Sequence, residues 1–142
     1  EVHGSHQIGV LADALFEEAD FGTYGGIVLP GGMPGTTALG SHPGVDGIIK
    51  SFAAEGKLVA AICAAPSVLG RAGLLKGKKA ACYPGVEEQL TGAEVVYEDV
   101  AEDGNIITSR GMGTAIPFAL KLAAYFTSER EAKDLAEAII YQ

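Results

Sequence analysis

Two short, uninterrupted apolar runs limit the folds open to this chain more than any other feature of its sequence. The first, Gly26 to Leu29, ends in Pro30-Gly31-Gly32, and the second, Leu58 to Ile62, ends at Cys63. Apolar runs of this length between turn signals are typical of strands that are buried on both faces. The segment Pro43 to Glu55 between them carries its apolar residues at helical spacing. A strand, a helix and a second strand in this order predict parallel strands with helices packed on them.

The rest of the chain continues this alternation without a linker or an internal repeat. Further strands are expected at Ile8–Ala12, Lys78–Cys82, Val95–Tyr97 and Asn105–Thr108, and further helices at Pro66–Ala72, Gly113–Phe126 and Glu131–Ile140. The spacing thus predicts one α/β domain over residues 1–142, with a mostly parallel sheet and helices on both of its faces.

Charge and composition exclude several classes of partner. The formal net charge is −8, and neither Lys nor Arg is concentrated in any segment, so nucleic acid and anionic membrane surfaces are not expected to bind. No apolar run approaches the roughly 18 residues of a membrane span. The two cysteines, Cys63 and Cys82, form neither a disulfide framework nor a metal signature, which favours a reducing, cytoplasmic location and no metal.

Cys63 follows its strand directly, with small residues on both sides. The segment Val59 to Pro66 reads Val-Ala-Ala-Ile-Cys-Ala-Ala-Pro, and small neighbours are what a sharp turn from strand to helix requires. Such a nucleophile elbow exposes the side chain at the carboxyl end of the sheet, where backbone amides favour the thiolate. The alternative is that Cys63 is a small buried apolar residue, which is the commonest role of a free cysteine.

Four segments resemble motifs of the ThiJ/PfpI superfamily and follow one another in that family's order. They are Gly4-Ser5-His6 with Leu11-Ala12-Asp13, Val28 to Gly32, Ala60 to Pro66, and Ile107 to Thr114. The third is similar to the family's nucleophile elbow, the second to its oxyanion-side loop and the fourth to its substrate-side loop. The chain most resembles the branch of YajL-like and parkinsonism-associated deglycases. The resemblance implies a flavodoxin-like three-layer sandwich that forms homodimers.

The resemblance also implies roles for individual residues. Cys63 would be the catalytic nucleophile, and the backbone amides of Gly32 and Ala64 would form its oxyanion hole, with Gly31 beside the substrate. The alternative for both glycines is a tight turn that needs a positive φ.

Four further residues are candidates for the substrate side, each with a plainer alternative. Tyr83 would form a hydrogen bond from its phenol to the substrate, or would simply pack as an aromatic wall of the site. Arg110, next to Ser109, would anchor a carboxylate or phosphate, or would pair with an acidic neighbour. His6 would face the pocket or a dimer contact, or would be a lone surface histidine.

An acid–base partner for Cys63 does not stand out in the sequence. In the family a glutamate on the first strand hydrogen-bonds the cysteine sulfur, and that strand would precede Glu1. We therefore expect the glutamate on a separate or cleaved N-terminal fragment, which would be a partner of this chain, and we expect Glu17 and Glu18 at the surface. No histidine follows Cys63, and Ala64 stands where PfpI-type peptidases carry one, which argues against peptidase and glutamine amidotransferase activity.

The resemblance thus implies cysteine-dependent processing of small reactive aldehydes or glycated groups, as in a glyoxalase III-like or deglycase-like reaction, with no cofactor. Two alternatives stay open. One is an oxidative-stress sensor or chaperone that uses oxidation of Cys63. The other is the thiazole monophosphate biosynthesis label that the family carries, although no glycine-rich phosphate loop supports it.

Overall fold

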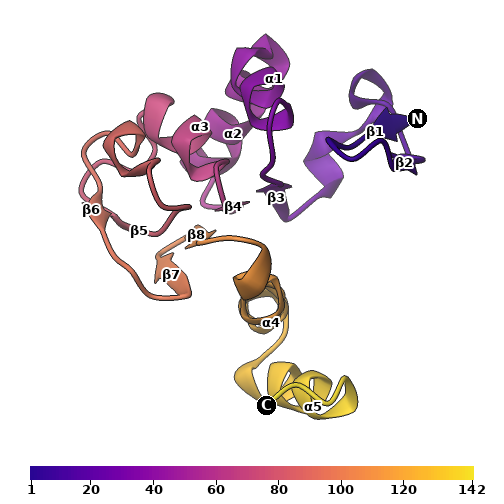
Figure 1. Cartoon of the computed structure of the whole chain (residues 1–142), viewed down its shortest axis with the longest axis vertical. Coiled ribbons are helices and arrows are strands. Elements are labelled where there is room, and N and C mark those ends of the chain that lie inside the picture. The colour runs from indigo at the N-terminus through magenta and orange to yellow at the C-terminus, as the bar shows by residue number, and fades with distance from the viewer.

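A four-stranded sheet lies at the centre of the structure, a computed structural model that describes residues 1–142. In spatial order its strands are β3 (Gly26–Leu29), β4 (Leu58–Ile62), β8 (Ile106–Ser109) and β7 (Val100–Asp103). Strands β3, β4 and β8 run parallel, and β7 pairs with β8 in the antiparallel sense. Figure 1 shows helices above and below this sheet, which confirms the predicted α/β class with a mostly parallel sheet.

Strand β4 has neighbours on both edges and helices on both faces. Its first four residues, from Leu58 to Ala61, are completely buried. Small side chains at Ala60 and Ala61 allow the covering helices to approach the sheet closely. The predicted bounds of β3 and β4 are both confirmed. The uninterrupted apolar run of β4 reflects burial on two faces, whereas β3 is equally apolar in sequence but only partly buried.

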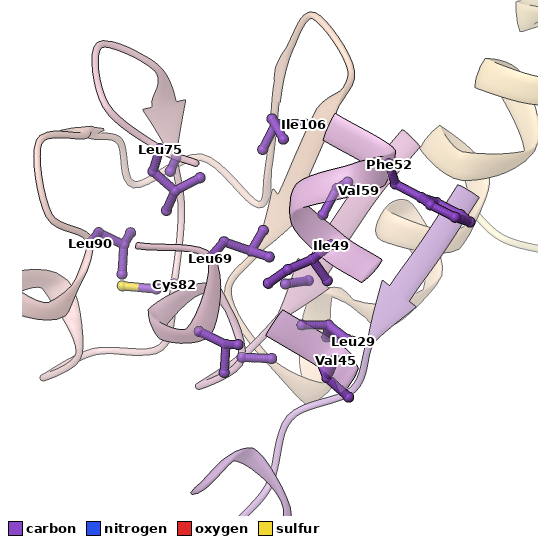
Figure 2. Packing of buried hydrophobic residues seen from close by; sticks show 14 residues of the cluster. Leu29, Val45, Ile49, Phe52, Val59, Leu69, Leu75, Cys82, Leu90 and Ile106 are labelled. Carbon is purple, nitrogen blue, oxygen red and sulfur yellow. The ribbon is translucent and has the colours of Figure 1, made fainter. Parts of the chain in front are cut away.

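Helices α1 (Gly35–Ser41), α2 (Pro43–Ala54) and α3 (Pro66–Arg71) cover one face of the sheet. The larger of two apolar clusters lies beneath them, and Figure 2 shows Ile49 and Leu69 among its labelled side chains. Ile49 is fully buried, as the helical spacing of Pro43–Glu55 predicts. Helix α1 was not expected, because its sequence GTTALGS contains two glycines, which are poor helix formers.

Helix α4 (Ala115–Phe126) covers the opposite face. Phe118 packs there with Leu58, Ala60 and Ile107 in the smaller apolar cluster. Helix α5 (Glu129–Ala138) packs on α4 and lies farther from the sheet in Figure 1. Of the α5 residues, Ala132 alone is buried.

The remaining elements are short. They are β1 (Val2–His3), β2 (Gly9–Val10), β5 (Lys79–Ala80), β6 (Glu94–Val95) and the 3₁₀ turns Phe16–Glu18, Phe21–Thr23, Glu87–Gln89 and Met112–Thr114. The strand predicted over Lys78–Cys82 is thus reduced to two residues, paired with β6 in a separate small sheet. Strands β1 and β2 form a hairpin that lies to one side of the main body in Figure 1.

Strand β3 is at an open edge of the main sheet. It pairs with β4 alone, and the Val28 side chain is 44% exposed. One row of its backbone groups therefore has no strand beside it. None of the helices has both the length and the apolar character that a membrane span requires.

Candidate functional site

Cys63 occupies a sharp turn between β4 and α3. Its φ is +66°, in the left-handed region that residues other than glycine rarely adopt, and two alanines follow before α3 begins at Pro66. The predicted elbow is therefore present. The side chain is half-buried, and the thiol is free.

The end of β8 and the loop that follows β5 hold the elbow by its main chain. The N–H of Cys63 donates to the carbonyl of Ser109 at 3.0 Å, and the N–H of Tyr83 donates to the carbonyl of Cys63 at 2.9 Å. Both polar backbone groups of Cys63 are thereby used. The position of its Cα is fixed by contacts that do not involve its side chain.

The loop after β3 packs directly against the elbow. A methyl group added to Gly31 would lie 2.6 Å from Cys63 Cβ and 3.3 Å from the backbone nitrogen of Ala64. Parallel strands β3 and β4 end at the same edge of the sheet, which brings the Gly31–Gly32 pair and Cys63 together. Glycine at position 31 is thus required by close approach rather than by a positive φ.

Two backbone N–H groups beside Cys63 have no acceptor. Gly32 has a φ of +88°, and its carbonyl accepts from the N–H and the Oγ1 of Thr36 at 2.9 and 2.8 Å. Its N–H donates no hydrogen bond within the chain, and the same is true of the N–H of Ala64. Unpaired amides of this kind are uncommon in folded proteins and are open to a ligand.

Two cavities adjoin the elbow. One has a volume of about 640 Å³ and lies between the N-terminal hairpin and the loop Pro30 to Pro34, with His3 as its one ionisable side chain. The other has a volume of about 320 Å³ and is lined by Ala64, Tyr83 and Arg71 among others. Met33 lines both cavities, and Cys63 itself lines neither. The thiol therefore lies next to residues of both cavities, not at the bottom of one.

Of the residues predicted for the substrate side, Gly31 lines the larger cavity and Tyr83 lines the smaller one. Tyr83 is 52% exposed, and a methyl group on Gly111 would lie 3.4 Å from its Cδ2. His6 does not line either cavity; it is exposed on the hairpin, where its Nδ1 is 3.1 Å from Ser5 Oγ.

Ser109 and Arg110 are turned to other partners. Ser109 is completely buried, and its hydroxyl donates to the carbonyl of Asp99 at 2.6 Å and lies 2.7 Å from Thr114 Oγ1. Its hydroxyl therefore shapes the loop rather than facing a cavity. The Arg110 guanidinium lies over the ring of Tyr97 at 5.6 Å, and its buried Nε has no hydrogen-bond acceptor.

The second cysteine differs from the first in its surroundings. Cys82 is buried in the larger apolar cluster, and Figure 2 shows its sulfur beside Leu90. Burial raises the pKa of the Cys82 thiol to about 11, with Glu87 adding to the rise and Arg110 opposing it. Cys82 is therefore a neutral thiol at physiological pH, whereas Cys63 is the thiol that solvent reaches.

Two ionisable residues of the cavities, Arg71 and His3, were not selected from the sequence. Arg71 and His3 come close to the elbow only through packing of helices and of the hairpin, which no local motif indicates. Arg71 lies four positions after Ser67 within the predicted helix Pro66–Ala72, so helical spacing was the one available signal. No group of three or more His, Cys, Asp or Glu side chains is placed to hold a metal ion.

Comparison with known proteins identifies this arrangement. The model of the DJ-1/PfpI family matches residues 1–125. The chain belongs to the DJ-1/PfpI family. It is 39% identical over 140 residues to Protein DJ-1alpha of Drosophila melanogaster, which covers 96% of this chain and 64% of that protein. It is 36% identical over 114 residues to the protein named Deglycase PYRAB04690 of Pyrococcus abyssi, which covers 79% of this chain and 68% of that one.

Solved structures of the DJ-1/PfpI family have the same fold. The crystal structure of Drosophila melanogaster DJ-1beta matches with a TM-score of 0.92 and 36% sequence identity, over 97% of this chain and 75% of that one. These matches confirm the ThiJ/PfpI resemblance and the flavodoxin-like fold that it implied. The chain spans about two thirds of the length of fly DJ-1alpha.

Proposed function

We propose that this DJ-1/PfpI chain processes reactive carbonyls through Cys63, as a glyoxalase-like or deglycase-like enzyme acting on small aldehydes or glycated groups. The observation that carries the proposal is the pair of unpaired N–H groups, of Gly32 and Ala64, beside a half-buried thiol on a strained turn. A relative named a deglycase supports the same chemistry.

The first step is attack of the Cys63 thiolate on an aldehyde carbon. The sulfur–carbon bond forms as the carbonyl π bond breaks, and its electron pair moves to oxygen. The N–H groups of Gly32 and Ala64 then donate to this developing alkoxide. Two fixed donors in a site with restricted water are worth several kcal/mol of transition-state stabilisation, because they need no reorganisation.

With an α-oxoaldehyde the hemithioacetal then isomerises to a thioester by moving a proton between the two carbons. Water hydrolyses the thioester to a hydroxy acid and restores the thiol, so no external oxidant or reductant is needed. The proton transfer requires a base. No hydrogen bond in this chain joins a carboxylate to Cys63, and we propose that a glutamate on a segment paired to the open edge of β3 supplies it.

Replacement of Cys63 tests the proposal. We expect Cys63→Ala and Cys63→Ser to abolish consumption of methylglyoxal and release of free amine from its adduct with N-acetyl-lysine. Cys82→Ala is the matched control, because Cys82 is buried with a raised pKa, and it should keep its turnover. Unchanged turnover in both Cys63 variants would remove the proposal.

The same two amides also suit a sulfinate on Cys63, which is the sensor alternative. Mild peroxide treatment followed by intact mass spectrometry separates the two functions. A two-oxygen gain on Cys63 in a protein that never consumes aldehyde would favour the sensor.

We further propose that two copies of the chain associate through the N-terminal arm, in a reducing compartment such as the cytoplasm. Every residue from Glu1 to Leu15 is exposed, including the apolar Ile8, Val10 and Leu11. Apolar side chains gathered on one arm are typical of a contact surface. We expect Leu11→Glu to lower the mass measured by light scattering toward that of one chain; an unchanged mass would contradict this contact.

A further inference from the structure

The 320 Å³ cavity beside Ala64 contains one charged side chain, that of Arg71. In a chain with 18 acidic and 10 basic residues, an acidic lining would be the ordinary expectation, yet no carboxylate lines this cavity. Arg71 is also absent from the four ion pairs of the structure. Its positive charge is therefore not neutralised, either by an ion pair or by a carboxylate in the cavity.

The position of Arg71 follows from α3. Ser67 and Arg71 are four residues apart on one face of this helix, and they line the same cavity as Ala64 of the preceding turn. Because helical side chains lean toward the N-terminus, the Arg71 side chain reaches back along α3 toward Ser67, in the direction of the elbow.

Arg71 is exposed, and its guanidinium lies beside α1 and makes one weak contact with its own helix. A methyl group on Gly40 of α1 would lie 3.4 Å from Arg71 Nη2, so the lack of a side chain there leaves room for the guanidinium. Arg71 Nε lies 3.5 Å from the carbonyl of Ser67, a long hydrogen bond that leaves the other donors free.

Further polar groups of the cavity are also without partners. No side-chain hydrogen bond in the structure involves Thr37, Tyr83 or Gln89. The hydroxyls of Thr36 and Ser67, by contrast, already donate to backbone carbonyls. The cavity thus offers one cation and three neutral polar groups next to the residue that follows the nucleophile.

We propose that this cavity binds the carboxylate of an anionic substrate, with Arg71 as its specificity-determining residue. The inference rests on the proposed function of Cys63 and names its substrate class, which is an aldehyde or glycated group with a carboxylate several bonds from the reacting carbon. A planar guanidinium suits a carboxylate through two parallel hydrogen bonds.

A pair of alkylating reagents tests this without requiring turnover. N-iodoacetyl-β-alanine and its amide have the same reacting carbon and differ in one carboxylate, five bonds away. We expect the acid to alkylate Cys63 about fivefold faster than the amide at low salt, and less so at high salt. The rates are followed by intact mass spectrometry.

Three variants separate specific binding from a general effect of charge. Arg71→Met should lower the acid-to-amide rate ratio to about one, and Arg71→Lys should keep part of the preference for the acid. Arg130→Met removes the same charge from α5, across the sheet, and should keep the full ratio. Equal rates for the two reagents, or equal effects of Arg71→Met and Arg130→Met, would overturn the carboxylate site alone. Failure of both reagents to label Cys63 in the folded chain would overturn the proposed function with it.

Discussion

Gly31 and Cys63 approach so closely that no side chain fits between them. A methyl group on Gly31 would lie 2.6 Å from Cys63 Cβ and 2.8 Å from the carbonyl oxygen of Ile62. The first atom belongs to the elbow, whose main chain is hydrogen-bonded on both sides, and the second to the last residue of β4, so neither can move aside cheaply. The loop that carries the unpaired Gly32 amide is therefore seated directly on the elbow.

Substitution of Gly31 should damage both stability and the site. We expect Gly31→Ala to lower the free energy of unfolding by about 1–3 kcal/mol, because overpacking displaces the loop or the elbow. Urea unfolding measures the loss, and the alkylation rate of Cys63 reports the displacement. Gly35→Ala is the matched control, since no atom lies within 4 Å of the added methyl group there. Equal stability of the two variants would contradict this account of the contact.

The left-handed backbone of Cys63 predicts an unusual ranking of substitutions. We expect Cys63→Gly to be more stable than Cys63→Ala by about 0.5–1 kcal/mol, because glycine adopts a φ of +66° without strain. At Ala65, whose φ is −65°, the glycine variant should instead be less stable than the wild type. Urea unfolding of the three variants checks both signs, and a less stable Cys63→Gly would argue against strain at the elbow.

The raised pKa of Cys82 predicts a loss of stability at alkaline pH. The pKa of the Cys82 thiol rises from its ordinary value of 9.0 to about 11 on folding, so the folded state holds the thiol proton more tightly than the unfolded state does. This contribution to stability is complete below pH 9 and is lost as the pH rises toward 11, at a cost of up to a few kcal/mol.

A comparison with Cys82→Ala isolates that thiol from the lysines and tyrosines that titrate in the same range. We expect the stability difference between wild type and Cys82→Ala to shrink between pH 8 and pH 10.5, measured by urea unfolding with a reductant present. A difference that does not change with pH would show that Cys82 does not titrate in this window.

The buried hydroxyl of Ser109 predicts a structural effect. Removing it in Ser109→Ala leaves the carbonyl of Asp99 without its donor, which should cost about 1–3 kcal/mol. Ser51→Ala, which removes an exposed hydroxyl from α2, should cost much less. Hydrogen exchange at the Gly111 amide, which donates to Thr114 Oγ1, should speed up in the Ser109 variant. Unchanged hydrogen exchange and unchanged stability would contradict this structural role and favour the predicted role of Ser109 in substrate binding.

Local sequence patterns predicted the elements whose residues are uniformly apolar. Strands β3 and β4 have the bounds expected of them, because each is an uninterrupted apolar run between turn residues. Strand β7 was missed because its sequence, VAED, is half acidic and forms through antiparallel pairing with β8. No local pattern encodes that partner.

The candidate site divides in the same way. The elbow and the glycine loop were predicted because small residues at strand ends are typical of tight turns. The structure has those turns at Cys63 and Gly32. Arg71 and His3 reach the cavities through the packing of α3 against α1 and of the hairpin against the loop. Such tertiary neighbours have no signature in the sequence.

The main-chain hydrogen bonds of Cys63 fix the shape of the elbow independently of its side-chain sulfur. Because Ser109 and Tyr83 bond to the peptide groups alone, exchange of sulfur for selenium would alter the reactivity of the side chain and leave its position unchanged. In such an elbow the reactive atom can be exchanged without any change in the surrounding backbone.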